Sequence, residues 1–455
     1  MLFLAFLALL APADWVPARW PWTEPKTLDL VAGSPVNCLL VEWDAAAPEP
    51  VTLFAREAKA KGFLTLAVLR PQSDAVAAAR RAVDSGLNGV VLEGDFSDPA
   101  SVHEALAGTG AAVIELTARR LMRFDSGQPV LGTYQGVWPG IQITEDGHAK
   151  AGPTGSPWID TNTGFIRAAR SNGDFTLWMG NRPPDGAVIT TRRYLQVISD
   201  AAMSGARWVV AFDAGLASGV HSGDSKALET WAAILNHLKF IESRPEWRTL
   251  SPYGQLALVQ EASASGLLSG GILDMIATKH TPVRAVPPHR LDPGALAGIR
   301  MAVNVDPAGL TDAQKNTLRG FARGGGTLLT APSGWKSASG EAITLEEEEL
   351  KRLDEIWREI NSMIGRTNLG ARLFNVSSMI SALLSDGGRS YAHIVNFSEY
   401  PVESVAVHFQ GKFTKATLWT PEGGEQALEV YPAEEGAATG VDIPQVSVWA
   451  TVRLD

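Results

Sequence analysis

The chain has 455 residues, of which 45% are hydrophobic and 19% charged, and its formal net charge is −10. This composition excludes a disordered chain or a small disulfide-stabilised module, and the length predicts two to four domains at roughly 100–200 residues each. The negative charge gives no electrostatic basis for binding nucleic acid or an anionic membrane, so we expect neither as a partner.

Cysteine and histidine usage limits the chemistry further. The single cysteine, Cys38, cannot form an internal disulfide, and no Cys/His group has the spacing of a zinc site. The HExxH and G-x-S-x-G motifs of zinc and serine hydrolases are also missing from the sequence. We therefore expect neither a metal nor a cofactor.

The N-terminal residues 1–13 (MLFLAFLALLAPA) are apolar and end in a small-x-small pattern that a signal peptidase reads. They predict a signal peptide and a secreted or periplasmic protein; a buried N-terminal strand or helix is the alternative. No later segment has 18 uninterrupted apolar residues, so we expect no membrane association of the mature form. The sequence leaves open whether the chain forms a homo-oligomer.

From Val36 onward, short apolar runs alternate with helical stretches, a pattern typical of an α/β fold with buried parallel strands. The eight predicted strands are residues 37–44, 64–70, 89–95, 112–116, 130–134, 158–160, 175–179 and 208–213. Eight such units in about 210 residues predict a (β/α)₈ TIM barrel over residues 30–245, the expected catalytic domain. A doubly wound sheet is the alternative, but no G-x-G-x-x-G turn follows the first predicted strand.

Two further regions follow the barrel. Alternating strands and helices predict an α/β domain over residues 251–340. Residues 341–455 predict a charged helix and then an antiparallel β domain of sandwich type, because apolar and polar residues alternate between turn signals such as Pro421–Gly424.

Polar residues at the carboxyl ends of barrel strands are candidate site residues, because barrel active sites lie there. The predicted strand ends carry the carboxylates Glu42, Asp44, Glu93, Asp95, Glu115, Asp160 and Asp213. Other polar and aromatic residues at these ends, expected to hold substrate, are Tyr134, Gln135, Trp138, Trp158, Trp178, Asn181 and Arg182.

This mixture predicts glycosidic bond cleavage, in which one carboxyl group protonates the leaving oxygen and another acts as nucleophile or base. The 14 tryptophans fit this reading, since indole faces can hold sugar rings, although they also pack in cores. Asp44, Asp95 and Asp213 have structural alternatives as helix caps, turn formers or ion-pair partners.

The predicted order of domains resembles the barrel-type β-galactosidases that carry a degenerate glutamine-amidotransferase-like domain. The segment from Leu318 to Leu329 (LRGFARGGGTLL) is similar to the helix-Gly-Gly-strand joint of that middle domain. The resemblance implies a domain without amidotransferase chemistry, and Cys38 lies in the predicted barrel instead.

The resemblance also bears on the catalytic residues. Those enzymes carry glutamates at the ends of strands four and seven, of which only Glu115 can be carried over. The α-galactosidase-like barrels use carboxylates on strands four and six, which Glu115 and Asp160 match in place but not in motif. We therefore predict a glycoside hydrolase acting on a carbohydrate, with Glu115 and Asp160 as the catalytic pair and Glu93 in reserve. The alternative is a catalytically inactive carbohydrate-binding or scaffolding protein on the same fold.

Overall fold

The computed structural model describes residues 11–72, 74–143, 149–151, 161–262, 266–331, 347–365, 370–374, 376, 378–433 and 438–455. The chain divides into two compact units by its internal contacts. The first unit comprises Met1–Ala151, Asp174–Ile198 and Ala206–Pro245, and the second comprises Gly152–Gly173, Ser199–Gly205 and Glu246–Asp455.

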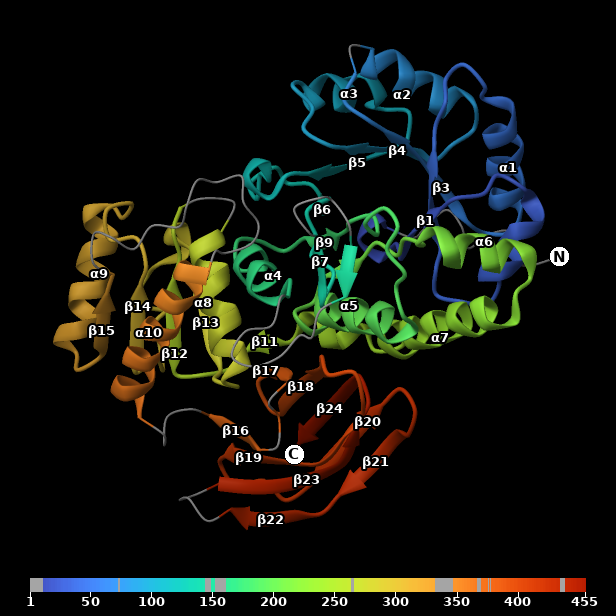
Figure 1. The fold of residues 1–455 in the computed structure, drawn as a ribbon. Helices are drawn as coiled ribbons and strands as arrows, with labels where there is room; N and C mark the ends of the chain where they lie inside the picture. The colour runs from blue at the N-terminus through green and yellow to red at the C-terminus, as the bar shows by residue number, and fades with distance from the viewer. Residues whose placement is uncertain are drawn as a thin grey trace. The chain divides into compact units, whose positions relative to one another are not determined.

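The first unit is an eight-stranded parallel barrel (Figure 1). In sheet order its strands are β1 (Pro17–Trp20), β2 (Cys38–Glu42), β3 (Leu64–Leu69), β4 (Gly89–Glu93), β5 (Ala112–Thr117), β6 (Val130–Thr133), β9 (Thr176–Met179) and β10 (Arg207–Trp208). A parallel bridge between Ala18 and Val210 joins the two ends of this sheet, with the Arg19 amide donating to the Val210 carbonyl at 2.7 Å. The predicted (β/α)₈ fold is therefore confirmed.

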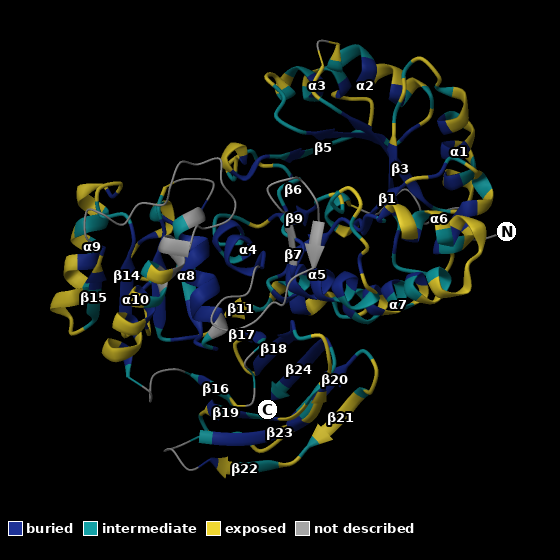
Figure 2. Ribbon diagram, viewed as in Figure 1, coloured by how far each residue is buried: buried dark blue, intermediate teal, exposed yellow. Residues whose placement is uncertain are grey.

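The barrel interior is apolar because alternate residues of each strand point inward. Leu40, Leu66, Val91, Ile114 and Trp178 belong to one buried cluster that spans five strands. The helices of this unit are α1 (Glu49–Ala60), α2 (Ala75–Asp84), α3 (Pro99–Leu106), α6 (Ala214–Ser222) and α7 (Ser225–Glu242), while α5 (Thr191–Met203) begins in this unit and ends in the second. Helix α3 is capped at its N-terminus, since the Asp98 side chain accepts from the Ser101 amide. On α1, α2 and α3, exposed residues lie away from the buried strands (Figure 2).

The strand count differs from the prediction in two places. The first barrel strand is β1 at Pro17–Trp20, before the predicted start at residue 30, so the strand predicted as first is the second. Pairing of β6 directly with β9 leaves no position between them for the strand predicted at 158–160, residues that lie outside the described part of the chain. The short pair β7 (Ile141–Ile143) and β8 (Ala149–Ala151) forms a separate sheet.

Helix α4 (Thr163–Arg170), predicted as a barrel helix, packs instead within the second unit. Its Gly164 lies so close to α8 (Leu267–Thr278) that a Cβ there would be 2.0 Å from the Gly270 carbonyl oxygen. The glycine at this position therefore permits the close contact of the two helices.

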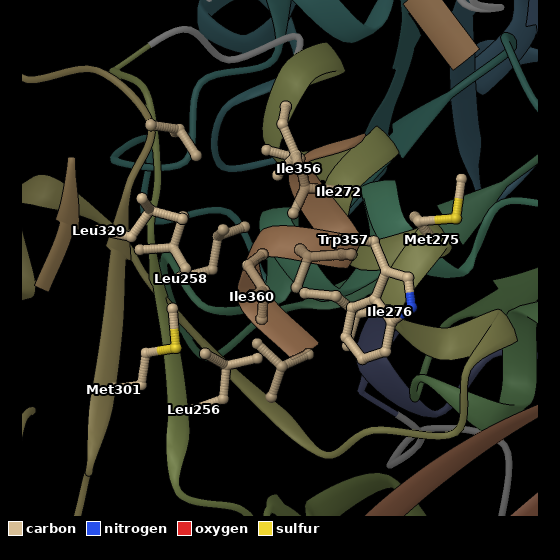
Figure 3. Packing of buried hydrophobic residues seen from close by; sticks show 14 of the residues in the cluster. Leu256, Leu258, Ile272, Met275, Ile276, Met301, Leu329, Ile356, Trp357 and Ile360 are labelled. Atoms are coloured by element: carbon tan, nitrogen blue, oxygen red, sulfur yellow. The ribbon is translucent and has the colours of Figure 1, made fainter. Parts of the chain in front are cut away.

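The second unit contains a four-stranded parallel sheet in the order β13 (Val283–Val286), β12 (Leu256–Val259), β14 (Met301–Asn304) and β15 (Thr327–Thr330). The helices that belong to it are α8, α9 (Asp312–Arg323) and α10 (Glu347–Ile364). Ile356, Trp357 and Ile360 of α10 pack with Leu258 of β12 in one buried cluster (Figure 3). Helix α10 thus joins the parallel sheet rather than the terminal β domain with which the sequence grouped it. That this α/β domain is amidotransferase-like stays a prediction.

The C-terminal region consists of two antiparallel sheets, as predicted. One has the order β11 (Ser251–Pro252), β17 (Met379–Ser385), β18 (Ser390–Asn396), β24 (Trp449–Leu454), β20 (Ala416–Thr420) and β21 (Gly424–Leu428). The other has the order β16 (Ala371–Phe374), β19 (Val402–Gln410), β23 (Ala438–Val446) and β22 (Val430–Ala433). Residues of both sheets, including Ile394, Val407 and Ile443, share one buried core. Across the described ranges, no helix is both long enough and apolar enough to cross a bilayer.

Candidate functional site at the barrel mouth

Charged side chains from the first four strands meet at the carboxyl end of the barrel. Glu93, the last residue of β4, accepts two hydrogen bonds from the Arg19 guanidinium of β1, at 2.7 and 2.8 Å. Arg70, directly after β3, donates to the second carboxylate oxygen of Glu93 at 2.5 Å. Since β1 and β4 are not neighbours, the Arg19–Glu93 pair crosses the barrel interior.

The same network extends to β2 and to the segment after β9. Arg70 also donates to Glu42 at 3.1 Å, and Arg182 forms an ion pair with Glu42. We call Arg19, Glu42, Arg70, Glu93 and Arg182 the mouth cluster. Its inner members Arg19 and Glu93 are each 8% exposed, whereas the side chain of Glu42 is 59% exposed.

The electrostatics of the mouth cluster keep Glu93 ionised. Burial alone would raise the pKa of this carboxyl group, but the charges and hydrogen bonds of Arg19 and Arg70 outweigh burial and hold the pKa below its ordinary value. A carboxylate of this kind can stabilise positive charge or act as a nucleophile, but it is a poor proton donor at neutral pH.

Asp95 lies beside this cluster, two residues after Glu93. It accepts from the Ala118 amide at 3.0 Å, from Arg120 at 3.1 Å and from the Tyr134 hydroxyl at 3.2 Å. Burial, and then the negative charge of Asp95, raise the pKa of Tyr134, so this phenol stays protonated and donates. Asp95 thereby links the ends of β4 and β6.

Four predicted substrate-binding residues have structural roles instead. Gln135 accepts from the Arg119 amide at 2.8 Å, and Asn181 donates to the Gly136 carbonyl at 2.8 Å. Asp44 is exposed and accepts from the Ala46 amide at 2.8 Å, as expected of a turn residue. Asp213 caps α6 through the Leu216 amide and also accepts from the Tyr194 hydroxyl. These bonds fix the loops around the mouth.

The tryptophans predicted as sugar platforms pack in cores. Trp178 is fully buried in the barrel interior, and Trp138 is 4% exposed, with Tyr194 and Trp208 packed edge-on against it. An indole enclosed on both faces cannot stack on a sugar ring, so these two assignments were wrong. Trp158 lies outside the described residues.

Glu115, the first-choice catalytic residue, does not face the barrel mouth. Its neighbours Ile114 and Leu116 point into the barrel core, so strand alternation turns Glu115 to the outer face of β5. There its carboxylate lies 2.9 Å from the His103 imidazole of α3. Asp160, its predicted partner, lies outside the described residues, which leaves Glu93 as the described member of the predicted catalytic set that reaches the mouth.

The sequence did not predict the role of Arg19 of β1 or a second buried charged cluster. Arg19 lies on β1, a four-residue strand for which no strand was predicted from the sequence. The second cluster, which we call the α4 cap cluster, consists of Asp200 of α5, Asp274 of α8, and Asn162, Gly164 and Arg167 of the α4 segment. No group of three or more acidic, His or Cys side chains suited to a metal occurs in the part of the chain that the structure describes.

In the α4 cap cluster, carboxylates from other helices cap the N-terminus of α4. Asp200 accepts from the Asn162 amide at 2.7 Å, and Asp274 accepts from the Gly164 amide at 2.6 Å. Burial, followed by the charge of Asp200, raises the pKa of Asp274 to about 7, although Arg167 acts in the opposite direction. Burial lowers the pKa of Arg167 to about 10 despite its carboxylate neighbours.

Comparison with known proteins identifies the fold and no sequence family. No protein family model matches the sequence, and neither does any curated protein. Among solved structures, the chain is similar to alpha-L-fucosidase isoenzyme 2 from Paenibacillus thiaminolyticus, with a TM-score of 0.66 and 11% identity over 98% of this chain and 100% of that one.

Two weaker similarities are to other glycoside hydrolases. A catalytic mutant of a GH42 beta-galactosidase from G. stearothermophilus aligns at 11% identity with a TM-score of 0.33, covering 88% of this chain and 66% of that one. Bacillus licheniformis trehalose-6-phosphate hydrolase aligns at 9% identity with a TM-score of 0.39, covering 97% and 99%. This chain shares its fold, a parallel α/β barrel followed by antiparallel sheets, with the fucosidase structure.

Proposed function

We propose that the protein is a glycoside hydrolase in which Glu93 is the ionised carboxylate of the active site. The observation that carries the proposal is the position of Glu93 at the carboxyl end of the fourth barrel strand. The barrel-type β-galactosidases that the sequence resembles carry a catalytic glutamate on strand four, and the α-galactosidase-like barrels also use a carboxylate there. Once β1 is counted, that strand ends in Glu93 and not in Glu115.

The surroundings of Glu93 suit this role. A nucleophile or oxocarbenium-stabilising carboxylate has to be ionised at neutral pH, and Arg19 and Arg70 lower the pKa of Glu93 accordingly. The proton donor is a separate assignment. The sequence prediction names Asp160 as its candidate, a residue outside the described part of the chain.

We also propose that the protein is exported after cleavage near Ala13. Supporting this, β1 begins at Pro17, so removal of residues up to Ala13 leaves the first barrel strand intact. Trp15, buried in the barrel core, is also retained. N-terminal sequencing of the protein from its native host checks this proposal; an intact Met1 on the recovered protein would refute it.

The test of hydrolysis uses the full chain and a panel of chromogenic α- and β-aryl glycosides. Glu93→Gln should reduce turnover of any accepted substrate by at least about 100-fold, because the amide cannot act as nucleophile or charged stabiliser. Glu115→Gln is the matched control, since that carboxylate faces α3, and it should retain the wild-type rate. Circular dichroism at the assay temperature must show all proteins folded.

A second candidate function is carbohydrate binding without hydrolysis. It is favoured by the fact that both carboxylate oxygens of Glu93 already accept hydrogen bonds from guanidinium groups. In that case no glycoside of the panel is turned over, whereas calorimetry or a glycan array still detects sugar binding. Equal turnover by Glu93→Gln and wild type would refute the assignment of Glu93.

A further inference from the structure

The second unit contains a cavity of about 100 Å³ whose lining residues all belong to that unit. Its walls come from α4, the turn that follows α5, the 3₁₀ helix η5 (Pro245–Thr249), β13 and β17. A volume of this size holds about three water-sized groups, so it suits a small ion or the head of a larger ligand.

Three arginines line this cavity: Arg167 and Arg170, one turn apart on α4, and Arg248 on η5. No Asp or Glu is among the described residues that line it. The lining therefore has a local excess of positive charge, in a chain whose net charge is −10. Because the overall charge repels anions, an anion bound here would owe its affinity to this local arrangement.

The guanidinium groups of Arg167 and Arg170 are held in place by backbone carbonyls. Arg170 donates to the carbonyl of Gly205 and, at 2.9 Å, to that of Arg248. Arg167 donates to the carbonyl of Ser381 at 2.9 Å. Gly205 has a φ of +84°, and a Cβ on it would lie 2.3 Å from Arg170 Nη1. The glycine thus makes room for the arginine, and the site is organised before any ligand binds.

A hydroxyl group adds a neutral donor to the same wall. Ser204 Oγ is buried and has no hydrogen-bond partner among the described residues. A buried hydroxyl without a partner costs free energy, which a polar ligand that bonds to it in the cavity would recover. Guanidinium forks and a hydroxyl are the donors that bind oxyanions most strongly.

We infer that this cavity is a binding site for a tetrahedral oxyanion, phosphate or sulfate, either free or as a group on a larger ligand. Three cations line the cavity. Asp200 and Asp274 of the α4 cap cluster offset the charge of Arg167 alone. A dianion therefore fits the cavity better than a carboxylate does. The inference does not depend on the proposed glycoside hydrolysis.

The experiment is calorimetric titration of the full-length protein with phosphate, sulfate and acetate at constant ionic strength. We expect saturable binding of one phosphate or sulfate per chain, and binding of acetate at least tenfold weaker. Arg248→Gln should weaken phosphate binding at least tenfold, and Arg248→Lys, which keeps the charge but loses the fork, should have an intermediate effect.

Two further variants separate the effect of the arrangement of the arginines from that of the net charge. Gly205→Ala leaves all three charges in place but should displace Arg170, so it should also weaken binding at least tenfold. Arg323→Gln removes an exposed arginine of α9 and should leave binding unchanged. Absence of saturable phosphate and sulfate binding to the wild type would overturn the inference. Binding that Arg248→Gln and Gly205→Ala retain in full would overturn it as well, and equal affinity for acetate would overturn the tetrahedral assignment.

Discussion

The mouth cluster of the barrel and the α4 cap cluster of the second unit both bury arginines and carboxylates, but with opposite ratios of cations to anions. In the mouth cluster, two arginines share the single buried carboxylate Glu93, and its pKa is lowered. In the α4 cap cluster, two carboxylates share one arginine, and the pKa of Asp274 rises to about 7. Burial disfavours the charged form in both places, so the ratio of cations to anions decides the sign of the shift.

This difference separates two uses of a buried carboxylate. Glu93 has lost its proton at neutral pH and is available for charge stabilisation, which is why it and not Asp274 enters the proposed mechanism. Asp274 takes up a proton near neutral pH, and its bonds are to the Thr161 hydroxyl and the Gly164 amide at the start of a helix. Its surroundings are those of a structural cap.

The largest effect is expected from removing Arg19, the buried cation of the mouth cluster. Arg19→Met leaves the buried Glu93 with Arg70 alone, and loss of one partner of a buried ion pair costs about 3–5 kcal/mol. Urea denaturation followed by circular dichroism measures the loss. The double variant Arg19→Met/Glu93→Met should recover most of it, because Arg70 retains Glu42.

The control for this prediction is Arg56→Ala on α1. Arg56 pairs with Glu57, but its side chain is 73% exposed, so the change should cost about 1 kcal/mol or less. A similar loss for Arg19→Met and Arg56→Ala would mean that the mouth cluster is not a buried network.

A smaller loss is expected from crowding the α4 cap cluster. In Gly164→Ala the new methyl group would lie 2.0 Å from the Gly270 carbonyl oxygen and 2.7 Å from the Asp274 carboxyl carbon, and overpacking of this kind costs about 1–3 kcal/mol. Gly320→Ala in α9 is the matched control, since a Cβ there meets nothing within 4 Å. That control should gain about 0.5–1 kcal/mol from helix propensity. Thermal unfolding of both variants compares the two, and a stabilised Gly164→Ala would show that α4 and α8 are not in close contact.

The two clusters also differ in how far the sequence predicts them. Glu93 ends the apolar run of residues 89–93, and that local pattern correctly predicts both the strand and the end of the barrel at which Glu93 lies. Strand β1 has four residues and is followed by a 3₁₀ helix, η3 (Pro25–Val31), rather than an α-helix, so no strand-helix period marks it. Missing β1 shifted the strand count by one and gave Glu115 the position that belongs to Glu93.

The sequence also allows a prediction of the face of β5 on which Glu115 lies. Ile114 and Leu116 are the apolar neighbours of Glu115, and alternation alone places a residue between two core residues on the opposite face. The α4 cap cluster, by contrast, could not be predicted. Asp200 and Asp274 lie on helices far apart in the chain, and their meeting depends on how α4, α5 and α8 pack, which no local periodicity encodes.

The sharpest distinction between the clusters is the pH dependence of stability. The pKa of Asp274 is about 7 in the folded protein and 3.8 for an ordinary aspartate, so between these values the folded state binds more protons than the unfolded state. Stability from this group is therefore full below pH 3.8 and is lost as the pH rises toward 7, with a slope of up to about 1.4 kcal/mol per pH unit. Glu93 has the opposite sign, because its lowered pKa contributes stability that is lost as the pH falls.

Asp274→Asn keeps the oxygen that accepts from Thr161 and Gly164 and removes the titration. Urea denaturation between pH 5 and 8 should show a less negative slope for this variant than for the wild type, whereas Asp442→Asn, an exposed carboxylate of β23, should leave the slope unchanged. If the wild-type and Asp274→Asn slopes coincide, Asp274 is ionised throughout this range, and the ratio of cations to anions does not explain the difference between the clusters.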